Sequence, residues 1–258
     1  MSQLDTRKLE ILRKMGIDVW SFRDPLHNRE SEPESAVSAK TETSQSEFGQ
    51  SVSGVSEAEQ LKTPELDGVS VSITDLTLDT IADRIRSCHN CGLSRTRNHV
   101  VPGHGSAVAD WVFVGEAPGR EEDIQGLPFV GSSGKMLDSM IAALGVDRAA
   151  VFITNGVKCR PPENRAPFPE EISQCSRYLK QQLEVIKPKV IVTLGCSSAH
   201  LLLDSEEPLR NLRQIIHSYG ERQIPLIATY HPAHLLRDPG DKLDVWEDLL
   251  LARSLAES

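Results

Sequence analysis

Residues 110–119 read DWVFVGEAPG, and this stretch indicates the fold. A short apolar run that ends in a polar, glycine-rich turn is typical of a strand buried on both faces. Three later runs have the same character, namely VFITN (151–155), KVIVTLG (189–195) and IPLIATY (224–230). Amphipathic segments separate them. Apolar strands that alternate with helices predict an α/β fold with a parallel sheet covered on both faces.

The expected helices begin and end at recognisable residues. Asp75 or Thr77 is a candidate N-cap for a helix over 78–88, and Gly145 ends a helix that begins at Gly134. Pro169 opens a helix that reaches about Ile186. Two further helices are expected at 197–203 and 244–255.

Polar residues follow three of the expected strands, and the segment after the first extends to 131. Glu116 and Phe129 belong to that first segment, Asn155 ends the second strand, and His231 follows the fourth. In parallel sheets the ligand crevice lies beyond the carboxyl ends of the strands. Each residue alone more often has a structural role, but the four together at one rim predict a binding pocket.

Four of the five cysteines form two distant pairs. Cys88 and Cys91 form a CxxC motif, and Cys159 and Cys175 are spaced as C-x15-C. A metal centre would hold such pairs together, and thiolates favour zinc or an iron–sulfur cluster. The spacing alone does not choose between them.

The charge is unevenly distributed. The net charge is −9, of which residues 1–75 carry −6 and the remainder −3, so the body can present a local basic face. Candidates for that face lie beside the motifs: Arg95, Arg97, Lys158, Arg160, Arg165 and Arg237. With no run of about 18 apolar residues, no membrane span is expected. No secretory signal is evident, and free cysteines favour a cytoplasmic protein.

The chain divides into three parts. Residues 1–27 look like a short amphipathic segment, 28–75 are rich in Ser, Glu and Gln and predict a disordered linker, and 76–258 form the expected folded domain. The segment KMGIDVWSFRD (14–24) weakly resembles the N-terminal peptide with which the psi subunit of the bacterial clamp loader docks. This resemblance suggests a replication partner for 1–27, and a helix that packs on the body is the alternative.

Three segments carry a denser resemblance. GEAPGREEDIQGLPFVGSSG (115–134), TNGVKCRPPENR (154–165) and HPAHLLRDP (231–239) resemble the signature motifs of the family 4 uracil-DNA glycosylases. The resemblance implies a three-layer α/β/α fold around a four-stranded parallel sheet. It also implies monofunctional removal of uracil from single- and double-stranded DNA, with an abasic site as product in base excision repair. The spacing of Cys88, Cys91, Cys159 and Cys175 matches the family's 4Fe–4S ligands, with zinc as the alternative.

The pocket residues suit that chemistry. Uracil must be flipped out of the duplex, and Phe129 would stack on it. Asn155 would pair with N3–H and O4, and His231 would donate to O2 as charge develops there. Glu116 would act on the attacking water or the sugar, and the backbone at Ala117 and Pro118 would approach the base.

Two other interpretations remain open at this stage. One is a binding module with the same fold and cluster that recognises nucleic acid without catalysis. The other is a nucleotide-binding or redox protein, although no GxGxxG or GxxxxGK[ST] loop follows the first strand. Asp123 is expected to hold the geometry of its loop.

Overall fold

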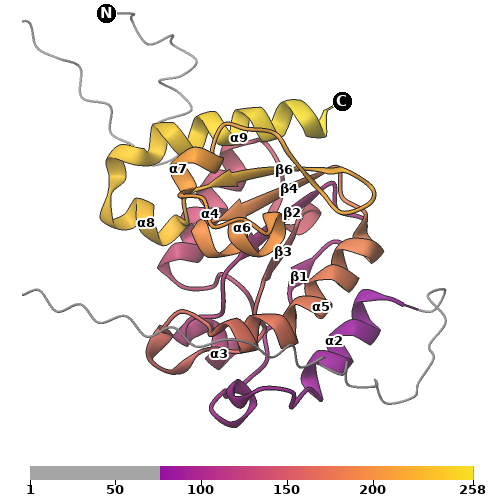
Figure 1. Cartoon of the computed structure of the whole chain (residues 1–258). Coiled ribbons are helices and arrows are strands. Elements are labelled where there is room, and N and C mark those ends of the chain that lie inside the picture. Colours follow the sequence, from indigo (N-terminus) through magenta and orange to yellow (C-terminus); the bar gives the residue numbers. More distant parts are fainter. Residues whose placement is uncertain (1–75, 258) are drawn as a thin grey trace, which may run out of the picture. The chain divides into compact units, whose positions relative to one another are not determined.

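Six strands form one mixed sheet in the computed structural model, which describes residues 76–257 (Figure 1). The order across the sheet is β1-β3-β2-β4-β6-β5. The strands are β1 His104–Gly105, β2 Trp111–Gly115, β3 Phe152–Asn155, β4 Val190–Leu194, β5 His217–Tyr219 and β6 Ile224–Thr229. The predictions for residues 1–27 and 28–75 lie outside the described residues.

The predicted four-stranded parallel sheet is confirmed as the centre, but its strand count is wrong at both edges. β3, β2, β4 and β6 are parallel, whereas β1 pairs with β3 and β5 with β6 in antiparallel orientation. The edge strands have two and three residues and a largely exposed pattern. Such short polar strands lack the apolar run that identified the central strands.

Helices connect the strands and cover the sheet. The α-helices are α2 Leu78–Arg86, α3 Arg120–Gln125, α4 Ser132–Ala143, α5 Pro169–Ile186, α6 Cys196–Leu203, α7 Leu209–Leu212, α8 Pro232–Arg237 and α9 Lys242–Ala256. Four short 3₁₀ helices are η2 Gly92–Arg95, η3 Arg148–Ala150, η4 Pro162–Asn164 and η5 Pro239–Asp241. Each helix expected from the sequence is present at nearly its predicted bounds.

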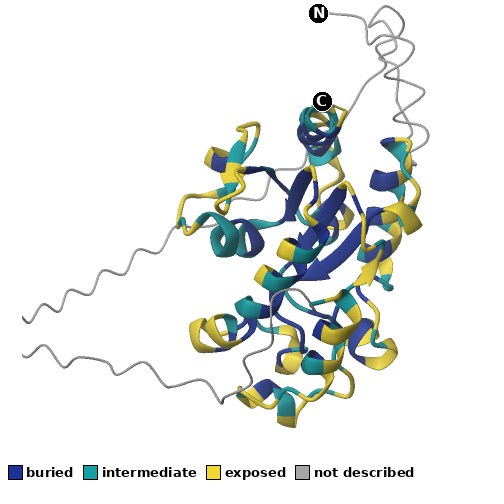
Figure 2. Cartoon of the chain, turned by 90° about the vertical axis from the view of Figure 1, so that its right-hand side faces the viewer, coloured by how far each residue is buried: buried dark blue, intermediate teal, exposed yellow. Residues whose placement is uncertain are grey.

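The two faces of the sheet bury different side chains of the same strand. Trp111 and Phe113 pack with residues of α4, α8 and α9, whereas Val112 and Val114 pack with residues of α5. This alternation follows from the period of two along a strand. The buried strands therefore lie between two helical layers, as Figure 2 shows. The three-layer α/β/α architecture predicted from the sequence is confirmed.

A third apolar cluster lies at the cysteine-bearing side of the sheet. The N-cap of α2 is Thr77, whose hydroxyl accepts from the Thr80 N–H at 3.2 Å. Ile81 and Ile85 of α2 pack against Tyr178 of α5 and against the cysteines. The N-terminal helix of the described region thus closes the cysteine site. Between residues 76 and 257 the structure has no helix that could cross a membrane.

Candidate functional site

The carboxyl ends of the parallel strands bring three predicted side chains together. Gly115 and Asn155 are register partners on β2 and β3. A Cβ atom at Gly115 would lie 2.4 Å from Asn155 Oδ1 and 2.7 Å from Phe129 Cζ, so only glycine leaves room for both. The rings of Phe129 and His231 are 5.6 Å apart between centroids and tilted by 31°. Phe129, Asn155 and His231 therefore share one site.

Asn155 offers an unused acceptor in this site. The residue is 2% exposed, and Oδ1 has no hydrogen-bond partner among the described residues. Leaving a buried acceptor unpaired costs about 1–3 kcal/mol. The carboxamide is therefore poised for a ligand that donates a hydrogen bond.

His231 is held as a neutral donor. It is the N-cap of α8, and its Nδ1 accepts from the Ala233 N–H at 3.1 Å, so the neutral ring carries its proton on Nε2. Burial lowers the pKa of His231 to about 4, and the positive charge of Arg237 acts in the same direction. At neutral pH the imidazole can therefore donate from Nε2 without carrying a charge.

This pKa gives the protein a defined pH dependence. The folded state has a pKa of about 4 for His231, against 6.5 for the unfolded chain, so the unfolded chain binds the extra proton between these values. The His231 contribution to stability is complete above pH 6.5 and is lost as the pH falls toward 4. We expect His231→Asn, which retains an N-cap, to unfold in urea with a smaller loss of stability over this window than wild type. Equal pH slopes for both proteins would contradict this expectation.

The loop that carries Phe129 is held by a buried carboxylate. Phe129 has a left-handed backbone (φ 52°). Glu122 Oε1 accepts from the N–H groups of Val130 (3.0 Å) and Gly131 (3.3 Å), and Oε2 accepts from Gly119 N–H (3.1 Å). The strained conformation at Phe129 is thus maintained by contacts from its own loop.

A second set of contacts fixes the carbonyl side of the same loop. Arg148 donates to the carbonyl oxygens of Pro128 and Phe129, both at 3.1 Å. A Cβ at Gly134 would lie 2.0 Å from the Phe129 oxygen, so helix α4 needs glycine here. The sequence did not identify Glu122; its place three residues after Gly119, in a capping position, was the available signal.

Glu122→Gln tests this support. Glutamine has one acceptor oxygen where the carboxylate has two, so at least one of the three backbone N–H groups loses its partner. Hydrogen bonds to charged groups contribute about 1.5–3 kcal/mol. We expect a lower free energy of unfolding by roughly that amount and reduced activity. Glu121→Gln, on the exposed neighbour, is the control. Equal urea midpoints for the two variants would show that Glu122 does not support the loop.

The remaining predicted residues of the first segment have different surroundings. Glu116 is half-buried, its carbonyl accepts from Val157 N–H at 2.9 Å, and it lines a wide groove with Ile172 of α5 and Leu201 of α6. Pro118 is buried, and Ala117 packs against the cysteine-side cluster. Asp123 accepts from the main-chain N–H of Asn98 (2.9 Å) and from its side-chain amide (2.6 Å), so it holds the geometry of its loop.

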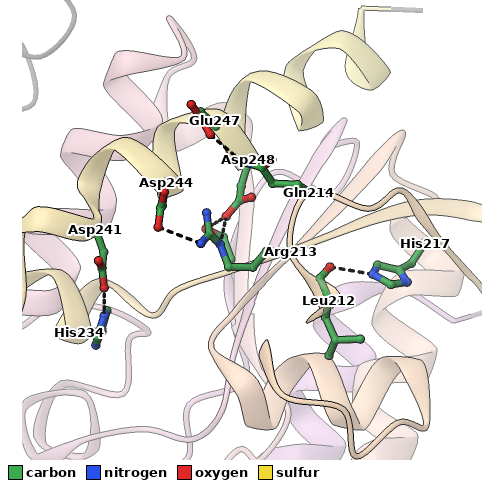
Figure 3. A network of polar contacts seen from close by, with 10 residues as sticks. Leu212, Arg213, Gln214, His217, His234, Asp241, Asp244, Glu247 and Asp248 are labelled. Atoms are coloured by element: carbon green, nitrogen blue, oxygen red, sulfur yellow. Dashed lines mark hydrogen bonds and ion pairs between the residues drawn. The ribbon is translucent and has the colours of Figure 1, made fainter. Parts of the chain in front are cut away.

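The turn that carries His231 is braced by the residue before it. Arg213 lies 4.5 Å above the Tyr230 ring, and the His234 ring stacks on Tyr230 at 4.7 Å. Figure 3 shows Arg213 reaching Asp244 and Asp248 of α9, at 3.1 and 2.7 Å. The figure also shows His234 bonded to Asp241, at 2.6 Å. Tyr230 therefore contacts two side chains that carboxylates of α9 and η5 hold in place.

The four cysteines predicted as ligands line one small cavity. Cys88 and Cys91 come from the segment after α2, Cys159 follows β3, and Cys175 lies on α5. Within residues 76–257, no group of three or more His, Cys, Asp or Glu side chains has the arrangement of a metal-ion site. The four cysteines nevertheless share the lining of this one cavity.

Donors from the protein point at the sulfur atoms. Arg97 Nη1 donates to Cys159 Sγ at 3.1 Å, and the main-chain N–H of Lys158 donates to Cys175 Sγ at 3.2 Å. Burial raises the pKa of Cys159, and it raises that of Cys175 to about 11. Without a metal these thiols are protonated, whereas hydrogen bonds to sulfur suit thiolate ligands of a metal centre.

One of the residues expected on a basic face, Lys158, does not lie on the surface. Lys158 is 1% exposed and cannot reach solvent. Arg97 is half-buried and is directed at Cys159 and at the carbonyl of Cys88, and Arg165 pairs with Glu171. The sequence places basic residues beside the motifs, but it does not show which of them turn inward.

Comparison with known proteins identifies the family of this chain. Residues 102–250 match the model of the family described as "Uracil DNA glycosylase superfamily". The type-4 uracil-DNA glycosylase of Archaeoglobus fulgidus is 46% identical over 170 residues, which cover 63% of this chain and 85% of that protein. The protein of the same name from Thermotoga maritima is 40% identical over 181 residues, 69% of this chain and 93% of that protein.

A relative of a different type is less similar. The type-5 uracil-DNA glycosylase of Pyrobaculum aerophilum is 31% identical over 135 residues, 51% of this chain and 57% of that protein. The type-4 proteins match more of this chain at higher identity. The chain therefore belongs to the uracil-DNA glycosylase superfamily and, within it, to the type-4 group.

Proposed function

We propose that this chain is a uracil-DNA glycosylase that hydrolyses the N-glycosidic bond of uracil flipped out of DNA. The product is an abasic site, so the reaction initiates base excision repair. The observation that carries the proposal is the convergence of an aromatic ring, an unpaired buried carboxamide oxygen and a neutral imidazole donor at one rim of the sheet.

Phe129 and Asn155 recognise the base. Stacking of the flipped ring on Phe129 contributes about 1–3 kcal/mol. Asn155 Oδ1 accepts from uracil N3–H, and the amide nitrogen donates to O4. Cytosine presents an acceptor at N3 and an amino donor at C4, so it opposes both contacts. The carboxamide therefore selects uracil over cytosine.

His231 stabilises the departing base. As the glycosidic bond stretches, negative charge develops on uracil O2 and positive charge on the sugar. A neutral Nε2–H in this site stabilises that oxygen by donating a hydrogen bond. The Ala233 N–H contact at Nδ1 sets the tautomer that this step needs.

Glu116 acts on the attacking water or on the cationic sugar. It lies directly after β2 and lines the wide groove, where it is partly exposed to solvent. Carboxylate activation of water contributes typically about 10²–10⁴-fold, so a variant without it should retain measurable activity. The main chain at Ala117 and Pro118 approaches the base from below.

Cys88, Cys91, Cys159 and Cys175 would hold a 4Fe–4S cluster. The four thiols line one cavity, and protein donors point at two of their sulfur atoms, which supports a thiolate-ligated metal centre. The match of their spacing to the family's 4Fe–4S ligands favours the cluster over zinc. When bound, the cluster supplies a cross-link between the α2 side of the domain and the end of β3. We expect purified protein to contain iron and inorganic sulfide and to absorb visible light. Colourless protein with stoichiometric zinc would overturn this assignment.

The activity is tested with a uracil-containing oligonucleotide, single-stranded or paired, treated first with the protein and then with alkali. We expect scission at uracil only after alkali, because a monofunctional glycosylase leaves the strand intact. The same oligonucleotide with thymine is the control. Strands that stay intact after alkali would contradict the proposed activity.

The roles of the three parts of the chain are proposed from the sequence. Residues 76–258 form the catalytic domain, 28–75 a linker, and 1–27 a docking segment for a replication protein in the cytoplasm. A pull-down with residues 1–27 that recovers no replication protein would remove the docking role.

A further inference from the structure

Lys158 is a buried lysine whose side-chain nitrogen donates three hydrogen bonds, all of them to uncharged oxygen atoms. The residue is 1% exposed. Nζ donates to Thr154 Oγ1 (2.6 Å), to the Asn155 main-chain oxygen (2.7 Å) and to Gln182 Oε1 (2.7 Å). Lysine is almost never fully buried without a charged partner, because its burial costs free energy. The burial of Lys158 therefore suggests a specific role.

The main chain and the side chain of Lys158 contact two different sites. Its main-chain N–H donates to Cys175 Sγ at 3.2 Å, and the next residue is Cys159. Its side chain turns back three residues to the carbonyl of Asn155, whose carboxamide faces Phe129 across Gly115. One residue thus joins the cysteine cavity to the base pocket.

Further bonds make this connection rigid. Thr154 Oγ1 donates to the Pro102 oxygen at 3.1 Å, and Gln182 Nε2 donates to the same oxygen at 2.7 Å. The Lys158 carbonyl accepts from Val101 N–H at 2.8 Å. The side-chain nitrogen of Lys158 therefore lies among hydrogen-bonded groups from β3, α5 and the segment before β1.

We propose that Lys158 is a positioning residue that orients Asn155 for uracil and couples the base pocket to the cysteine site. The proposal rests on the proposed role of Asn155. Without Nζ, three buried acceptors lose a donor and the end of β3 can shift. A displacement of about 1 Å at such a site can cost about 100-fold in rate.

The first test compares Lys158→Met with Lys189→Met in the metal-loaded protein. Methionine keeps most of the length but has no donor. Lys189 is a matched control because its Nζ also donates to a carbonyl, that of Ala256 (3.1 Å), but at the start of β4. For Lys158→Met we expect kcat to fall roughly 10- to 100-fold and the inhibition constant of free uracil to rise about tenfold. The KM for DNA should change less than about twofold, because the buried Lys158 side chain cannot itself contact a DNA phosphate.

The second test measures the coupling without using activity. Binding free energies are reciprocal, so uracil in the pocket should stabilise the metal site. Metal release into a chelating dye that reports iron or zinc should be slowed about fivefold by saturating free uracil in wild type. In Lys158→Met, uracil should leave the release rate unchanged. Equal protection in both proteins, or none in wild type, would overturn the coupling.

A second variant covers the case in which Lys158→Met does not fold. Gln182→Leu removes one of the three acceptors from α5 and should raise the uracil inhibition constant in the same direction by a smaller factor. Values within about twofold of wild type for the folded variants would overturn the positioning role. Failure of the proposed function is distinguishable, because wild type would then release no uracil.

Discussion

Asn155→Ala should reduce kcat/KM for uracil excision by roughly 10²–10³-fold. The alanine removes both hydrogen bonds that distinguish uracil, and it leaves N3–H and O4 of the flipped base without partners in a dry site. U:G and U:A duplexes should lose activity by the same factor, because the pocket contacts the flipped base and not its former partner. Initial rates on both duplexes measure the effect.

Asn211→Ala is the matched control for that variant. Asn211 donates to Glu207 on the surface at 2.8 Å and lies on α7, away from the Phe129–His231 pair. It should retain wild-type rates. Asn155→Ala should also fold about as stably as wild type, since Oδ1 has no protein partner to lose among the described residues. Activity of Asn155→Ala within about threefold of wild type would remove the carboxamide from the mechanism.

His231→Asn should lower kcat by roughly 10²–10³-fold with little change in KM, the signature of an interaction made mainly in the transition state. Asparagine is a good N-cap and can accept from Ala233 N–H, so helix α8 should persist. Its shorter amide cannot reach the position of Nε2. Single-turnover rates at neutral pH measure the loss.

His217→Asn controls for the loss of an imidazole. His217 lies on the edge strand β5 and contacts the Leu212 carbonyl at 2.8 Å. Its rate should match wild type. If His231→Asn instead raised KM and left kcat intact, His231 would serve binding alone, and the stabilisation of O2 would have to come from another group.

The central sheet and the site were predictable because each has a strong local signal. Runs such as 111–115 and 190–194 are almost entirely apolar and are buried at every position, which is the pattern of strands buried on both faces. The rule that ligands bind at the carboxyl ends of parallel strands then placed Asn155 and His231 at one rim. The structure brings these two together with Phe129.

The supporting residues were not predictable, because their roles depend on distant contacts. Glu122 is one of several acidic residues in its segment, and only the folded loop shows that it holds Val130 and Gly131. From the sequence alone Lys158 resembles a surface lysine. Only the folded chain shows that its side chain is buried and donates to Gln182 of α5. The edge strand His217–Tyr219 forms because β6 offers an open edge, and its own residues give no apolar pattern.

A crystal structure of the protein with free uracil would test the central claim most directly. The account predicts the ring stacked on Phe129, with N3–H and O4 at Asn155 and O2 within hydrogen-bond distance of His231 Nε2. Uracil bound at another cavity, or bound here with O2 turned away from His231, would contradict it.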